Sequence, residues 1–296
     1  MPIVLEEFLE DEHVQGFIRY FADVISGDED VNHEYEDRFL LKRARPYAQR
    51  TFQHLENAFY AYYWPEPDNT FEDNMDVLDP VKDQLRNARA EDDNEDGVFY
   101  SIAKTLWWGA GYSGTNLYTQ NMAWLQKMIG RGTSATEILN NVEAAFDAET
   151  FEPELFDDDT LRSNAGYTKV FALMKDDFVI YDSRVAAAIG LLIVRYCERQ
   201  APALDELPEN LEFGRSSATG NDNRDPSHAG FIFPDFEGDH SLHAASNWRA
   251  NVILSRAVAL LEGEDRRPEW IGADDALRTV EAALFMLGKH IPIEAG

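Results

Sequence analysis

The stretch of sequence that decides the predicted fold is residues 164–190, NAGYTKVFALMKDDFVIYDSRVAAAIG. Its first half predicts a turn and then a short apolar helix that begins near Lys169. The charged turn at residues 175–177 ends that helix, and residues 178–181 are apolar enough to be buried, either as a short strand or as a loop. Asp182 then stands where the N-cap of another helix is expected. We therefore expect two successive helices, one opened by a lysine and the next by an aspartate.

This arrangement suits a lysine nucleophile. A lysine amine attacks carbon only when it is neutral, and both burial and a helix N-terminus lower its pKa. A nearby carboxylate raises that pKa, so Asp182 is better suited to stabilise a developing sugar oxocarbenium ion than to activate the amine. The simpler alternative is structural: Asp182 caps its own helix, and Lys169 is a surface cation. The residues by themselves leave both interpretations open.

Outside this stretch, apolar residues recur at helical spacing along most of the chain. One apolar face lies within residues 14–25 and is followed by Gly27 as a C-cap, and another lies within residues 277–287 and is closed by Gly288. Further helices are expected at residues 48–63, 100–108, 117–129, 135–146, 184–199 and 243–262. Strand signals are scarce, so the predicted fold class is all-α.

Two segments break the helical pattern. Residues 64–96 are rich in Asp and Glu and contain three prolines, which predicts a solvated connection. Residues 201–240 are rich in proline and glycine and predict a long irregular loop, part of which docks through its phenylalanines. The helices and loops are expected to form one domain over residues 1–296, with two helical lobes, about 1–150 and 151–296, as a possible subdivision.

The charge of the chain excludes one class of function. Its 296 residues include 55 Asp and Glu but 26 Lys and Arg, for a net charge of −29. Such a surface repels nucleic acid and anionic lipid at long range, which excludes a broad basic face for duplex DNA but leaves room for a small basic pocket. The scarcity of lysine also fits adaptation to high salt, and an acidic protein kept soluble by its charge is the alternative.

The remaining composition favours a cytoplasmic protein without a membrane partner. No apolar run approaches the length of a membrane-spanning helix, and the first residues do not resemble a secretory signal. The one cysteine, Cys197, lies in an apolar run, so we expect a buried and inert thiol.

The sequence GAGYSG at residues 109–114 matches the dinucleotide-binding fingerprint in its letters. A helix precedes it where the fingerprint requires a strand, so we expect a glycine-rich turn between two helices and no nucleotide cofactor. The flanking residues Trp107, Trp108, Tyr112 and Asn116 are candidates to line a pocket, because aromatic faces stack well on flat bases.

A cluster of metal-binding residue types occurs at Asp239, His240 and His243. Two histidines three residues apart can share one helix face, but a zinc site needs three or four ligands in fixed geometry. A helix N-terminus capped by Asp239 or Ser241 explains the pattern without a metal, so no metal is expected.

Thr168-Lys169-Val170, a short apolar helix and then residues 180–185, IYDSRV, together resemble the catalytic segment of the helix-hairpin-helix DNA glycosylases, nearest to the 8-oxoguanine branch. The resemblance implies a helix-hairpin-helix glycosylase-like fold that excises a modified or oxidised purine from DNA. It also implies that Lys169 attacks the sugar C1′ while Asp182 assists, with or without lyase activity. Tyr167, Arg184 and Arg249 are further candidates for substrate binding.

The match departs from the family in its hairpin, where Ala165 and Tyr167 replace the usual glycines. The backbone amides of that hairpin normally hold a DNA phosphate, so the departure bears on DNA binding more than on fold. The chain also resembles divergent glycosylase-like proteins of bacterial antiphage operons that contain deazaguanine-synthesis homologues.

Two further functions stay open at this stage. One is a glycosylase-fold binding protein that recognises a modified nucleobase, a nucleotide or a protein partner; the other is an acidic DNA mimic. Several cations are expected to gather around the candidate site and to supply a basic pocket: Arg162, Lys169, Arg184, Arg195 and Arg199.

Overall fold

The computed structural model describes residues 1–42, 48–91, 94–216, 222–228, 230–272 and 275–292. These residues are mostly helical, with twelve α-helices against four short strands in the described ranges, so the expectation of an all-α chain is confirmed. Within the same ranges, no helix combines the length and the hydropathy that crossing a bilayer requires.

The α-helices are α1 (Leu5–Glu10), α2 (Glu12–Ser26), α3 (Arg38–Lys42), α4 (Leu55–Tyr60), α5 (Phe71–Ala90), α6 (Glu95–Gly109), α7 (Asn116–Gly130), α8 (Ala135–Asp147), α9 (Tyr167–Met174), α10 (Ser183–Arg199), α11 (His240–Gly263) and α12 (Ala276–Leu287). The strands are β1 (Ile3–Val4), β2 (His33–Glu36), β3 (Gln49–Phe52) and β4 (Thr150–Phe151), and the 3-10 turns are η1 (Pro153–Leu155) and η2 (Glu209–Leu211). Strand β1 pairs with β4 and β2 with β3, both antiparallel.

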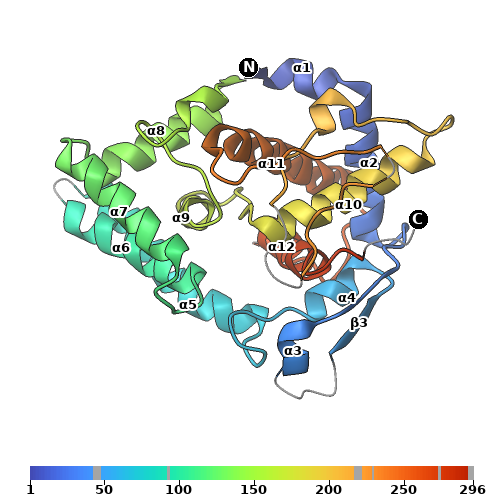
Figure 1. The fold of residues 1–296 in the computed structure, drawn as a ribbon, viewed down its shortest axis with the longest axis horizontal. Helices are drawn as coiled ribbons and strands as arrows, with labels where there is room; N and C mark the ends of the chain where they lie inside the picture. Colours follow the sequence, from blue (N-terminus) through green and yellow to red (C-terminus); the bar gives the residue numbers. More distant parts are fainter. Residues whose placement is uncertain (43–47, 92–93, 217–221, 229, 273–274, 293–296) are drawn as a thin grey trace.

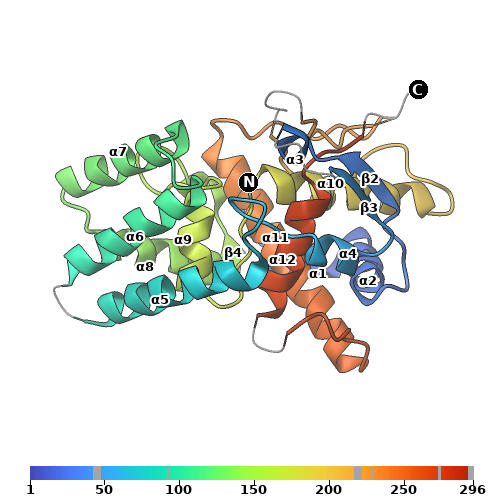
Figure 2. The ribbon, with the colours of Figure 1, turned by 90° about the horizontal axis from the view of Figure 1, so that it is seen from below.

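Helix α9 lies between two groups of helices. Figure 1 shows α5 to α8 on one side and α2, α4, α10, α11 and α12 on the other, with α9 seen end-on between them, and the turned view agrees (Figure 2). Both α5 and α6 pack against α9, while α12 packs on α4 and α10, and α11 on α2. One continuous cluster of buried apolar side chains joins the two groups. All eight residues of α9 are buried, so this position makes it the centre of the core.

The apolar faces predicted at the two ends of the chain are confirmed. Helix α2 buries Val14, Phe17 and Phe21 on one face, and Gly27 follows in the left-handed conformation with φ of 84°. Asp11 begins the helix by accepting hydrogen bonds from two backbone amides of its first turn. These contacts satisfy helix ends that would otherwise leave donors and acceptors unpaired.

The prediction of a non-helical, solvated connection at residues 64–96 is wrong for most of its length. Helix α5 occupies residues 71–90, with Pro80 inside it, and Thr70 forms a capping box with Asp73 at its start. The acidic residues lie on its exposed side, while Leu78, Val81 and Leu85 are buried. A narrow apolar stripe that packs on α6 is sufficient to stabilise this helix, although its average composition is that of a solvent-exposed segment.

The helix predicted at residues 48–63 is also wrong in part. Residues 49–52 form β3, which pairs with β2, and the helix is reduced to residues 55–60. Residues 201–240 contain η2 and no α-helix before α11 in the described part of the segment; residues 217–221 and 229 lie outside it. Phe231 and Phe233 are buried there, so this loop docks on the body.

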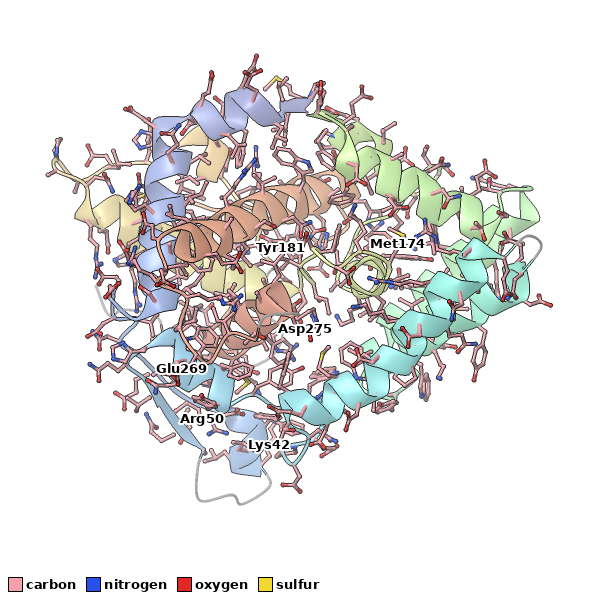
Figure 3. The ribbon with its side chains drawn as sticks, turned by 180° about the vertical axis from the view of Figure 1, so that it is seen from behind. Lys42, Arg50, Met174, Tyr181, Glu269 and Asp275 are labelled. Atoms are coloured by element: carbon pink, nitrogen blue, oxygen red, sulfur yellow. The ribbon has the colours of Figure 1, made fainter. Side chains whose placement is uncertain are left out.

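Residues 178–181 form a buried loop, the second of the two alternatives that the sequence left open. The amide of Val179 donates to Asn251 Oδ1 at 2.6 Å, and its carbonyl accepts from Asn247 Nδ2 at 2.9 Å. The amide of Ile180 donates to Glu281 Oε2 at 2.8 Å. These side chains of α11 and α12 satisfy the loop's backbone where no strand partner is present. Figure 3 places Tyr181 and Met174 toward the middle of the molecule, with Arg50 and Glu269 nearer its edge.

Candidate functional site

The turn before α9 is closed by a side chain. Asn164 Oδ1 accepts from the amide of Gly166 at 2.9 Å and from that of Tyr167 at 3.1 Å. Residues 148–166, all of which the structure describes, contain β4 and η1 but no α-helix. No α-helix therefore precedes the turn directly, and Asn164 occupies the two amides at the start of α9.

Lys169 lies in the first turn of α9 and is only 7% exposed. Its Nζ donates to the carbonyl of Ala165 at 2.6 Å, and its methylenes pack against Gly109, the last residue of α6. Burial lowers the pKa of the amine, and the negative charge of Asp182 opposes that shift without reversing it. The Lys169 amine is therefore neutral over a wider pH range than an ordinary lysine.

Asp182 is the N-cap of α10, as predicted. Its Oδ1 accepts from the amides of Arg184 at 2.8 Å and Val185 at 3.1 Å, and its Oδ2 accepts from Arg184 Nη1 at 3.1 Å. Burial disfavours the carboxylate, but the charges of Arg184 and then Lys169 outweigh it, so the pKa of Asp182 is lowered. Asp182 is thus a buried anion beside Lys169.

Lys169 and Asp182 line the same cavity, which we call the inner cavity. Its volume is about 30 Å³, close to the ~30 Å³ share of one liquid water molecule. The side chains of Lys169 and Asp182 form no ion pair within 4.0 Å in the described structure. The other residues that line the cavity are Tyr62, Trp64, Trp108, Gly109, Ile180, Arg184, Arg278, Glu281 and Phe285.

Two of these residues position the loop that carries Asp182. Arg278 and Glu281 form a buried ion pair one turn apart on α12, and Glu281 also accepts from the amide of Ile180. Burial raises the pKa of Glu281, and Arg278 limits that rise. Helix α12 therefore fixes the loop between α9 and α10 through a hydrogen bond.

A second space, the outer pocket, adjoins the inner cavity. Its volume is about 280 Å³, and both Trp64 and Arg184 line it as well as the inner cavity. The Arg184 guanidinium lies 4.5 Å from the ring centroid of Phe285 and 5.1 Å from that of Trp64, in cation–π geometry. The Arg184 side chain thus belongs to both spaces.

The outer pocket has a polar wall. Asp37 accepts from Tyr63 Oη at 2.7 Å and from Lys289 Nζ at 3.1 Å. Lys289 also lies 3.6 Å from the Tyr63 ring centroid, and burial lowers its pKa to about 7. Neither Asp37 nor Lys289 was a candidate from the sequence.

The glycine-rich turn joins α6 to α7, as predicted; the end of α6 lines the inner cavity, and the turn lines the outer pocket. Trp108 lines the inner cavity and donates to Asn74 Oδ1 at 3.0 Å, and Gly111 lines the outer pocket. Trp107 and Tyr112 are 39% and 47% exposed and lie outside both spaces. Asn116 is exposed at the start of α7.

Two other residues that were predicted to bind substrate contact the rest of the protein and line neither the inner cavity nor the outer pocket. Tyr167 is buried, and its hydroxyl donates to the carbonyl of Asn121 at 3.3 Å. Arg249 donates to the carbonyl of Glu212 at 2.9 Å. Both side chains hydrogen-bond to backbone carbonyls, and neither lines the inner cavity or the outer pocket.

The predicted gathering of cations is wrong for three arginines. Arg162 donates to His240 Nε2 at 3.1 Å, Arg195 donates to the carbonyl of Val31, and Arg199 pairs with Glu29. None of the three lines the inner cavity or the outer pocket. Sequence proximity to Lys169 and Asp182 misled this prediction. Helix α10 carries Arg195 and Arg199 away from the site, and Arg162 lies before α9, where His240 and Asp158 hold it.

The histidines near residue 240 serve the start of α11. Asp239 caps that helix by accepting from the amide of Leu242 at 2.8 Å. His243 is buried, with Nδ1 at 2.8 Å from Ser163 Oγ, and burial lowers its pKa to about 3. In the part of the chain that the structure describes, no three His, Cys, Asp or Glu residues are grouped as metal ligands.

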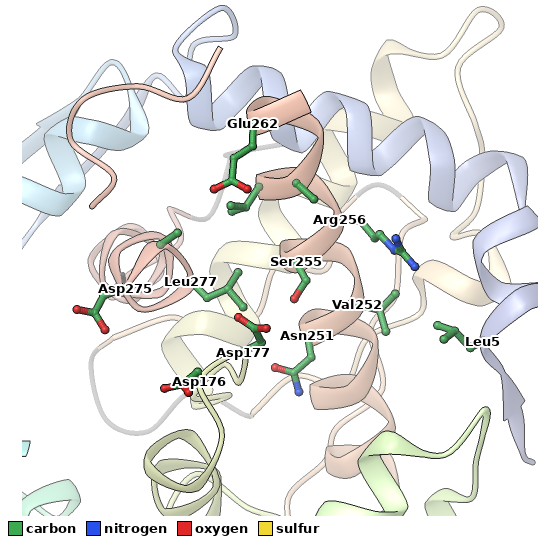
Figure 4. Close-up of a pocket in the computed structure, with 13 residues that line it drawn as sticks. Leu5, Asp176, Asp177, Asn251, Val252, Ser255, Arg256, Glu262, Asp275 and Leu277 are labelled. Atoms are coloured by element: carbon green, nitrogen blue, oxygen red, sulfur yellow. The ribbon is translucent and has the colours of Figure 1, made fainter. Parts of the chain in front are cut away.

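A separate groove of about 520 Å³ lies between α11, α12 and the turn after α9 (Figure 4). Neither Lys169 nor Asp182 lines it. Its Asp176 already pairs with Lys82 and Arg86, each at 2.8 Å. The groove therefore lacks the two residues on which the catalytic prediction depends.

No protein-family model matches the chain, and comparisons with curated proteins and with solved structures find no significant similarity.

Proposed function

We propose that this protein is a lysine-dependent DNA N-glycosylase or AP lyase that acts on a modified or oxidised purine, with a glycosylase-like arrangement around residues 164–190. The observation that carries the proposal is the inner cavity, which the Lys169 amine and the Asp182 carboxylate line together. A buried amine of lowered pKa beside an anion suits attack on a carbon that develops positive charge.

The step uses the neutral amine. The lone pair of Lys169 Nζ forms a bond to the sugar C1′ as the C1′–N bond to the base breaks, and the base leaves with that electron pair and takes a proton. The new ammonium loses a proton, and opening of the sugar ring gives an imine. The Asp182 carboxylate stabilises positive charge on the sugar while the bond breaks.

The substrate approaches through the outer pocket. The inner cavity has room for about one water, so it does not accept a base as it stands. Trp64 and Arg184 line both spaces, and the sugar reaches Lys169 when one of these side chains moves.

Borohydride trapping tests the proposal. The protein is incubated with oligonucleotides that carry 8-oxoguanine or other modified purines, at several salt concentrations, and the imine is reduced to a stable adduct. We expect an adduct with the parent protein and none with Lys169→Gln. Lys175→Gln is the matched control, because Lys175 follows α9 and pairs with Asp147 at its surface. Absence of both adduct and base release, or an undiminished adduct in Lys169→Gln, contradicts the proposal.

The pH profile of trapping gives a second readout. Asp182 raises the pKa of Lys169, so Asp182→Asn lowers that pKa further. Trapping should be slower in this variant because the anion is lost, but its rise with pH should have a lower midpoint. A midpoint that moves upward, or does not move, contradicts the assigned coupling.

A second candidate is a pocket that binds a modified nucleobase, a nucleotide or a protein partner without chemistry. It is favoured by the hydrogen bonds of Lys169 to Ala165 and of Asp182 to Arg184, since both groups already serve the protein. This candidate predicts binding that persists in Lys169→Ala, with no base release from any of the oligonucleotides.

A further inference from the structure

Arg224 is a cation without a carboxylate partner at the outer pocket. Its guanidinium donates to Ser183 Oγ at 2.6 Å. No carboxylate oxygen of the described residues lies within 4.0 Å of the Arg224 guanidinium, the distance that defines an ion pair. Burial, and then the positive charge of Arg184, lower its pKa to about 10, and the negative charges of Asp182 and Asp222, which lie beyond ion-pair distance, oppose that shift without reversing it. A partly buried cation in this position is costly unless an anion joins it.

The rest of the outer pocket supplies further donors. Arg184 lines it beside Arg224 and keeps guanidinium donors beyond the one that Asp182 uses. Asp37 is already paired with Lys289. The remaining charged residues that line the pocket are Glu36, Arg38, Glu66 and Asp222. The cations therefore match the carboxylates in number, in a chain whose net charge is −29.

The turn before α9 does not offer hydrogen-bond donors to an anionic ligand. Asn164 occupies the amides of Gly166 and Tyr167, so an anionic substrate must find its donors elsewhere. Arg184 lines both spaces, and Arg224 lines the outer pocket and hydrogen-bonds to Ser183, the residue before Arg184.

We propose that the outer pocket binds the phosphate ester of a nucleotide-sized ligand, with Arg224 as the anchoring cation and Arg184 as a second donor. Planar guanidinium groups hold phosphate oxygens through paired, charge-assisted hydrogen bonds. The volume of about 280 Å³ is near the low end of ligand pockets, roughly 300–1,000 Å³, and suits one nucleotide better than a duplex. The phosphate site does not depend on the proposed function. The further statement that its ligand delivers a sugar to Lys169 rests on the proposed function.

Calorimetric titration tests the site. The probes are inorganic phosphate, deoxyguanosine, deoxyguanosine 5′-monophosphate with its 8-oxo form, and a five-nucleotide single strand. We expect the phosphorylated probes to bind and deoxyguanosine to bind at least tenfold more weakly than its monophosphate. Arg224→Gln should weaken monophosphate binding about tenfold or more, and Arg224→Lys less. Arg256→Gln, which removes an exposed arginine from the separate groove, should leave binding unchanged.

Each outcome decides one statement. Two results overturn the phosphate site. One is that Arg224→Gln, with an unchanged melting temperature, binds the monophosphate as tightly as the parent protein does; the other is that the parent protein binds deoxyguanosine as tightly as its monophosphate. Arg224-dependent binding of the monophosphate assigns the phosphate to a free nucleotide, and tighter Arg224-dependent binding of the strand assigns it to nucleic acid. Phosphate binding without lysine trapping therefore leaves this inference intact while the glycosylase proposal fails.

Discussion

The position of the Lys169 side chain depends on the glycine at position 109. A methyl group added to Gly109 would overlap Lys169 Cδ and Cε, which lie against the end of α6. The amine hydrogen-bonds to Ala165, so its place is set from both sides. The missing side chain of Gly109 thus leaves the space in which the Lys169 side chain is buried.

Gly109→Ala should displace the Lys169 side chain and reduce borohydride trapping at least tenfold. Its cost in stability should be about 1–3 kcal/mol, the usual range for an added methylene in a packed core. Trapping rates and chemical unfolding of the same samples separate the two effects. The matched control is Gly114→Ala, because nothing lies within 4 Å of a Cβ at that position. Equal trapping by both variants contradicts the packing argument.

At the scale of the helix, α5 is an element that the sequence analysis missed because its segment is acidic and contains a proline. Pro80 lies inside this 20-residue helix, and its missing N–H leaves the Asp76 carbonyl without the usual partner four residues on. Both residues are exposed, so no core contact explains the proline.

Pro80→Ala should therefore stabilise the protein by about 1–3 kcal/mol, since a proline costs roughly 3 kcal/mol relative to alanine inside a helix. Urea unfolding followed by circular dichroism measures the change. Thr70→Ala is an opposing variant, because it removes the capping side chain of α5 and should cost about 1 kcal/mol. A destabilised Pro80→Ala protein would contradict this prediction, and would mean that the restriction proline places on the unfolded chain outweighs its cost inside α5.

The starts of α9 and α10 were predictable from the sequence because they depend on neighbours in the chain. Asp182 caps the helix that follows it, and the apolar run after Tyr167 is local as well. The loop at residues 178–181 could not be assigned in advance. Its backbone partners, Asn251 and Glu281, come from helices about 70 and 100 residues further along.

At the scale of the whole molecule, the dominant quantity is the net charge of −29. Repulsion among carboxylates opposes the compact state, while surface ion pairs such as Arg131–Asp159 add little stability each. Salt screens both effects, and the repulsion is the larger because acidic residues outnumber basic ones 55 to 26.

Raising KCl from 0.1 to 1 M should therefore stabilise the protein by about 1 kcal/mol and raise its melting temperature by a few degrees, since the screening length falls from roughly 10 to 3 Å. Thermal unfolding across a KCl series measures this effect. Screening predicts that most of the gain occurs below about 0.5 M. A melting temperature that falls with salt, or that rises only above 1 M, argues against charge repulsion as the cause.

The sequence by itself determined the helical class, the caps at Asp182 and Gly27, and the net charge of −29, because each follows from composition or from residues close together in the chain. Tertiary structure alone decided which groups meet Lys169. Trp64, Gly109 and Glu281 line its cavity from three distant elements, and no local pattern encodes such a meeting. The physical reason is that local preferences set where helices begin and end, whereas packing of their apolar faces decides which ends come together.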